Sequence, residues 1–234
     1  METAQPQPRD TGTGERMADL ARAKTSAITH KLQGEEQDQT GARFVVEAAE
    51  AERLTEDWPA APRKIARQMI ERYGAPNEAT PVRLVWHRNR PWKRTQVARD
   101  EIVHNFPTSH TDFLTQWIDY SVPPRRFSDI AEFDGSCLAD RTAGEAAARC
   151  DSEAMNILTL NLMHEIVTGS RAVDEARQVY AENAAAFTMG QDAPYAERLL
   201  FDVPEGGAVD PDEKVIGEAM AQKAKEAVTS DGSA

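Results

Sequence analysis

The stretch from Asp151 to Gly169 is the most hydrophobic part of the chain and constrains the fold more than any other feature. Its apolar residues recur at helical spacing but cover more than one face of the helix that they predict. These residues are Met155, Ile157, Leu158, Leu160, Leu162, Met163, Ile166 and Val167. A helix that is apolar on several sides must be covered by other elements, so we expect it to be central and packed on a sheet.

Two hairpins are predicted to supply that sheet. In the first, residues 82–87 and 92–99 alternate along the chain as strands do, and the loop Arg88–Pro91 joins them. In the second, residues 136–142 and 145–150 flank the turn residues Ala143 and Gly144.

A two-residue loop in the second hairpin would place Cys137 directly opposite Cys150. The geometry of such a pair permits a disulfide, and the alternative is two thiols packed side by side. A reducing compartment favours the packed thiols.

Between the hairpins, Ser109 to Asp112 has the spacing of a capping box and predicts the start of a helix. The predicted fold is therefore α+β, with two antiparallel β-hairpins in one four-stranded sheet, packed against a buried central helix with further flanking helices. Residues 1–42 are expected to form a largely disordered tail, residues 43–204 a single globular domain, and residues 205–234 a linker and an amphipathic helix. The terminal helices are candidates for self-association.

The first hairpin is unusually basic for a chain with a net charge of −12. Its basic side chains lie beside two tryptophans, which is a combination suited to clamping and stacking on an anion. The candidate ligand-binding residues are Arg83, Trp86, Arg88, Arg90, Trp92, Lys93 and Arg94. They predict a binding or regulatory protein that receives a small anionic ligand or an acidic protein segment, without a cofactor. The alternative is that these charges only solvate an exposed face.

Three residues that follow the first hairpin form a candidate metal site. His104, His110 and Asp112 offer two imidazoles and a carboxylate, a set that binds Fe(II) or catalytic Zn(II) when it converges. The spacing matches no motif with a known mechanism, and the chain has no nucleophile elbow, phosphate loop or dinucleotide fingerprint. The sequence therefore favours a non-enzymatic function, and a metal-dependent enzyme with a divalent metal is the alternative.

The charge balance narrows the possible partners and the compartment. Thirty-nine carboxylates stand against 27 lysines and arginines, which argues against broad nucleic-acid binding because that affinity depends on a basic footprint. No apolar run is long enough to predict a membrane span, and the first residues lack the pattern of a secretory signal. We therefore predict a cytoplasmic protein with two reduced cysteines.

Overall fold

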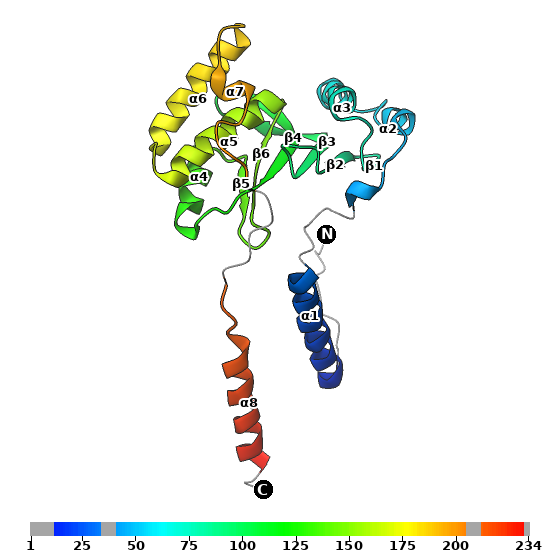
Figure 1. The fold of residues 1–234 in the computed structure, drawn as a ribbon, viewed down its shortest axis with the longest axis vertical. Helices are drawn as coiled ribbons and strands as arrows, with labels where there is room; N and C mark the ends of the chain where they lie inside the picture. The colour runs from blue at the N-terminus through cyan, green and yellow to red at the C-terminus, as the bar shows by residue number, and fades with distance from the viewer. Residues whose placement is uncertain (1–11, 34–40, 205–211, 232–234) are drawn as a thin grey trace, which may run out of the picture.

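The computed structural model describes residues 12–33, 41–204 and 212–231, and its centre is one antiparallel sheet (Figure 1). The sheet has six strands in the order β1-β2-β3-β4-β6-β5. The strands are β1 Glu78–Thr80, β2 Arg83–His87, β3 Arg94–His104, β4 His110–Asp119, β5 Cys137–Asp140 and β6 Glu145–Cys150. The α+β class is thus confirmed, whereas the predicted count of four strands is wrong.

Helices surround the sheet and extend from both ends of the described chain. They are α1 Thr13–Gln33, α2 Ala48–Leu54, α3 Ala60–Tyr73, α4 Phe127–Phe133, α5 Glu153–Thr168, α6 Val173–Thr188, α7 Pro194–Glu197 and α8 Ile216–Asp231. In Figure 1, α1 and α8 project away from the sheet. Among residues 12–32, Leu20 alone is partly buried, so α1 contributes almost nothing to the core.

The helix α5 is the buried central helix that its composition predicts. Eleven of its residues are buried, and it ends at Gly169, whose φ of 79° is cheap only for glycine. It packs on β4 and β6, while α3 packs beside it on β3 and β4. Each helix therefore covers its own half of the sheet.

The register shows that both halves belong to one face. Leu84 pairs with Val97, which pairs with Leu114, and Leu114 in turn pairs with Cys150. Directly paired residues point to the same side of a sheet, so these side chains share one face and are all buried. The other face carries cross-strand polar pairs such as Asp119 with Glu145.

The segment after Ser109 corrects our prediction of a capped helix, because it forms the strand β4. This strand lies between β3 and β6, and every residue from Asp112 to Gln116 is buried, whichever face of the sheet its side chain lies on. The polar and apolar alternation that identifies a half-exposed strand is therefore lost. The β-branched and aromatic residues of the segment were the signal for a strand.

The second hairpin forms as predicted, but its register corrects the predicted cysteine pairing. Asp140 pairs with Glu145, so the turn has four residues rather than two, and Cys137 faces Ala148 instead of Cys150. The Asp140 carboxylate accepts a hydrogen bond from the amide of Ala143 at 2.9 Å, which stabilises the longer turn. Both cysteines are free and buried.

The outer parts of the chain add two observations. Glu78–Thr80, in a stretch that reads as a connector in the sequence, is the edge strand β1. Within the predicted N-terminal tail, residues 13–33 are helical, and within the predicted C-terminal segment, residues 216–231 are helical. Residues 1–11, 34–40, 205–211 and 232–234 lie outside the described parts, so the predicted disorder and linker there stay predictions.

Candidate functional site

The tryptophans of the first hairpin are core residues rather than a stacking surface. Trp86 and Trp92 are each 1% exposed. The indole of Trp86 donates a hydrogen bond to the carbonyl of Gly74 at 2.9 Å, and that of Trp92 donates to the carboxylate of Glu153 at 2.6 Å. Each indole is thus committed inside the protein, and neither ring is available to a ligand at the surface.

The two basic residues that follow Trp92 are paired with carboxylates of the same chain. The Lys93 ammonium is buried, 2.9 Å from a carboxylate oxygen of Asp119 and 3.2 Å from one of Glu145. The Arg94 guanidinium lies 2.7 Å from Glu145 and stacks over the ring of Trp117 at 4.3 Å. These cations stabilise the polar face of the sheet.

The remaining three candidates of the hairpin are less buried. Arg83 and Arg90 are exposed, and Arg88 is half-buried at a φ of 56° in the loop. Arg88 and Arg90 have interactions of their own within the chain. The hairpin therefore lacks the combined aromatic and basic surface that the sequence predicts, because α3 and α5 cover the aromatic part.

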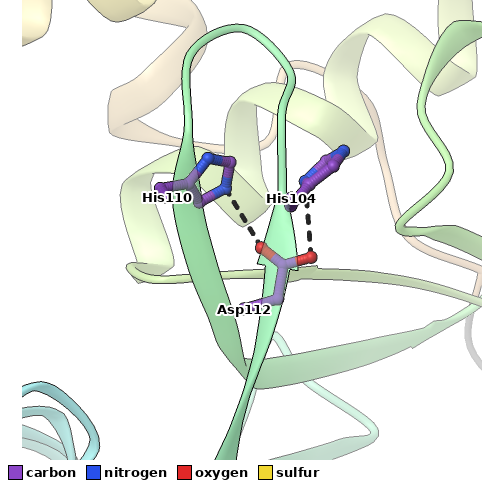
Figure 2. A group of neighbouring side chains, drawn as sticks. All are labelled: His104, His110 and Asp112. Carbon is purple, nitrogen blue, oxygen red and sulfur yellow. Dashed lines mark ion pairs between the residues drawn. The ribbon is translucent and has the colours of Figure 1, made fainter.

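The candidate metal residues, in contrast, converge at the end of the β3–β4 hairpin. The register shifts between Val97 and Ile102, and this shift brings His104 directly opposite His110. Asp112 is two residues further along β4, so its side chain lies on the same face as that of His110. Figure 2 shows one imidazole on each side of the Asp112 carboxylate.

The distances within this group are short. Nδ1 of His104 lies 3.3 Å from Oδ2 of Asp112, and Nε2 of His110 lies 3.0 Å from Oδ1. One nitrogen or oxygen atom from each residue falls within 4.8 Å of the others. Bonds of about 2.1 Å to a shared metal separate neighbouring ligand atoms by roughly 3.0–3.4 Å. Each imidazole lies at such a distance from a different oxygen of Asp112, which fits a metal that both carboxylate oxygens approach.

In each imidazole, the ring nitrogen that does not face Asp112 already has a partner. Nδ1 of His110 donates to the carbonyl oxygen of Thr108 at 2.8 Å, because a carbonyl is an acceptor only. Nε2 of His104 lies 3.5 Å from the carboxylate of Asp134. Carbonyl and carboxylate partners of this kind orient the histidines of metal sites and leave the other ring nitrogen to the metal.

The atoms of the three ligands that face one another have few hydrogen-bond partners in the protein. Nδ1 of His104 and Oδ1 of Asp112 are buried and lack a hydrogen-bond partner with suitable geometry. The side chain of Asp112 is 0% exposed, and its other oxygen accepts a hydrogen bond from the hydroxyl of Ser136. The Arg149 guanidinium is more distant, with its Nε 3.8 Å from the same oxygen. A buried carboxylate in such surroundings favours a further cation.

The sequence did not identify the supporting residues, because they come from distant segments. Asp134 and Ser136 follow α4, and the amide of Ser136 donates to the Asp134 carboxylate at 2.7 Å. Burial raises the pKa of Asp134 above its ordinary value, and the Ser136 amide opposes that shift. A short polar turn after a helix is common, so nothing in the sequence distinguished these residues.

Cys150 is the second neighbour that the sequence did not place here. Its sulfur lies 3.3 Å from Nε2 of His110, which is the distance of a thiol and imidazole pair. Burial raises the pKa of this thiol far above its usual range, and the Asp151 carboxylate raises it further. The neutral thiol is therefore the stable form in the metal-free chain, which argues against a nucleophilic cysteine.

A cavity of about 200 Å³ adjoins His110 and Cys150. Its other walls come from the loop before β4, the start of α5 and the last two turns of α6. The group of three ligands therefore has a cavity beside it that is large enough for a small molecule.

Comparisons with protein-family models, with curated proteins and with solved structures each find no match to this chain. In the parts of the chain that the structure describes, no helix combines the length and the apolar character needed to cross a membrane.

Proposed function

We propose that the protein is a metal-dependent enzyme whose metal is bound by His104, His110 and Asp112. Two imidazoles favour a transition metal such as Fe²⁺ or Zn²⁺ over Mg²⁺ or Ca²⁺, which prefer oxygen ligands. Three protein ligands are typical of catalytic sites, because they leave a position for water or substrate. The proposal reverses the ranking of our two predicted functions.

One observation carries this proposal, namely the orientation of His110. Its Nδ1 donates to Thr108, so in the neutral ring Nε2 presents a lone pair. That lone pair lies 3.0 Å from a carboxylate oxygen that has no aligned donor, and its own donor within the chain is the weakly donating Cys150 thiol at 3.3 Å. Two electron-rich atoms at this separation are stabilised by a cation that both bind.

The chemistry that follows is activation of a bound water or substrate oxygen. A divalent metal lowers the pKa of a bound water toward about 7, which supplies a nucleophile at neutral pH. The protein residues hold the ligands in place, and Ser136 and Asp134 fix Asp112 and His104 respectively. Metal-assisted hydrolysis is the reaction class that we propose.

The predicted anion-binding function of the first hairpin has less support. Trp86, Trp92 and Lys93 are buried, which leaves Arg83 and Arg90 as its exposed candidates. A cytoplasmic location stays a proposal that is supported by the two free cysteines.

Calorimetric titration with Zn²⁺ tests the proposed site. The wild-type chain is expected to bind one ion, and His110→Ala and Asp112→Asn are each expected to weaken binding by at least ~100-fold, because each loses a ligand. His30→Ala is the matched control, since His30 is exposed on α1, and it should bind as the wild type does. Equal affinity in all four proteins would contradict the proposal.

A further inference from the structure

The cavity beside His110 has no role in holding the three ligands, yet it shares a wall with them. His110 belongs to both, and the Cys150 thiol lies on the cavity wall 3.3 Å from the nitrogen that faces Asp112. The other sides of the group are occupied, because Asp134 lies against His104 and Ser136 against Asp112. Of the three ligands His110 is the one that lines the cavity, so the cavity reaches the group on the side of His110.

We infer that this cavity binds the substrate, a small molecule with an uncharged, apolar body and an oxygen-bearing head that reaches the metal. The inference rests on the proposed metal site. In this arrangement the substrate lies between the start of α5 and the end of α6, with its head toward His110.

The lining supports the uncharged body of the ligand. Asp151 is the acidic group of the lining, and among the residues that the structure describes no lysine or arginine lines the cavity. Away from the metal, a carboxylate or phosphate in the substrate would therefore meet the like charge of Asp151 without a compensating cation in the lining. Hydroxyl groups of Thr108, Ser152 and Thr188 are present instead, and they suit a neutral polar group.

The apolar part of the lining supports a hydrocarbon body. Met155, Ala184 and Phe187 line the cavity, and Phe187 is 45% exposed although it is a large apolar residue. An apolar ligand would cover part of that ring and gain the associated free energy. A volume of about 200 Å³ corresponds to roughly seven water volumes, which accommodates a chain of about six carbons.

Two hydroxamic acids test this arrangement with the Co²⁺-loaded protein, whose visible spectrum reports ligands at the metal. Acetohydroxamate carries the metal-binding head alone, and hexanohydroxamate adds four methylenes. We expect the longer probe to bind at least ~10-fold more tightly, because each methylene that enters an apolar site adds roughly fourfold.

Cavity-filling variants test whether the hydrocarbon chain of hexanohydroxamate lies in the cavity. Ala184→Leu and Thr188→Phe each extend a side chain into the cavity, and both should reduce the preference for hexanohydroxamate to within ~2-fold while acetohydroxamate still binds. Ala185→Leu is the matched control, since the neighbouring Ala185 is exposed on the same helix and does not line the cavity. It should keep the full preference.

A probe without a chelating head separates the cavity from the metal. Hexanamide should shift the amide NMR resonances of Met155 and Ala184 with or without metal, and Ala184→Leu should abolish the shifts. Absence of these shifts in the wild type would overturn the cavity as a binding site, whatever the metal does. Shifts with hexanamide, but no spectral change with acetohydroxamate in protein that binds Co²⁺, would instead refute the open position at the metal.

Discussion

Replacing Glu153 by alanine should destabilise the protein strongly, because its buried carboxylate joins four elements. Glu153 begins α5 and is 7% exposed. It accepts hydrogen bonds from the Trp92 indole at 2.6 Å, the Gln116 amide at 2.9 Å and the Tyr73 hydroxyl, and it forms an ion pair with Arg72. These contacts connect α5 to α3, to β4 and to the residues before β3.

The magnitude follows from the donors that would lose their acceptor. Trp92 and Gln116 have weaker second acceptors, the Tyr73 hydroxyl at 3.1 Å and the Thr95 hydroxyl at 3.5 Å, so each keeps part of its hydrogen bonding. With about 1–3 kcal/mol for each unsatisfied buried donor, and under about 1 kcal/mol for the exposed Arg72 pair, we expect a loss of about 3–5 kcal/mol. The Tm should fall by roughly 6–20 °C for a domain of this size.

Urea unfolding followed by circular dichroism measures this loss. Glu153→Gln keeps one oxygen as an acceptor, so it should lose about half as much as Glu153→Ala. Glu182→Ala, at an exposed position on α6, is the control and should stay within about 0.5 kcal/mol of the wild type. A change below about 1 kcal/mol in Glu153→Ala would refute the view that this carboxylate organises the core.

Two further predictions concern a half-buried histidine and a buried lysine. Burial lowers the pKa of His164, whose Nδ1 lies 2.8 Å from the Tyr120 hydroxyl and whose ring stacks on Phe201. As the pH falls, His164 is therefore protonated in the unfolded chain before it is protonated in the folded chain. The contribution of the neutral His164 to stability is full above about pH 6.5 and is lost as the pH falls below that value. The Tm of the wild type should fall more steeply between pH 7.5 and 5.5 than that of His164→Gln, and parallel curves would contradict this. Lys93→Met should cost about 3 kcal/mol in urea unfolding, because Asp119 and Glu145 lose their buried cation, and an unchanged midpoint would exclude that pairing.

The central helix and the two hairpins could be predicted from the sequence because each has its own local signal. The helix α5 has apolar residues on several sides, and β2 is a short apolar run beside a Pro-containing loop. The strand β4 could not be recognised in that way, since both of its faces are covered and its burial depends on β3 and β6. The turn length of the second hairpin likewise depends on the hydrogen bond that the Asp140 carboxylate accepts from the amide of Ala143, which strand periodicity does not encode.

For the candidate site, the sequence predicts which residues are potential ligands but not that they lie close together. His104, His110 and Asp112 were identifiable as potential ligands, but their convergence depends on the register shift in β3. Asp134 and Cys150 reach the group from other parts of the chain, so only the fold reveals them. In the basic hairpin, tryptophans beside arginines suggest an exposed surface when the covering helices are unknown, whereas Trp86 and Trp92 are buried.

Metal analysis of the untagged protein, purified without chelator, tests the central claim most directly. We predict about one equivalent of a transition metal per chain in the wild type and less than ~0.1 equivalent in the double variant His104→Ala/His110→Ala. A wild-type protein that is as free of metal as the double variant, and that stays so after incubation with Fe²⁺ or Zn²⁺, would contradict the account.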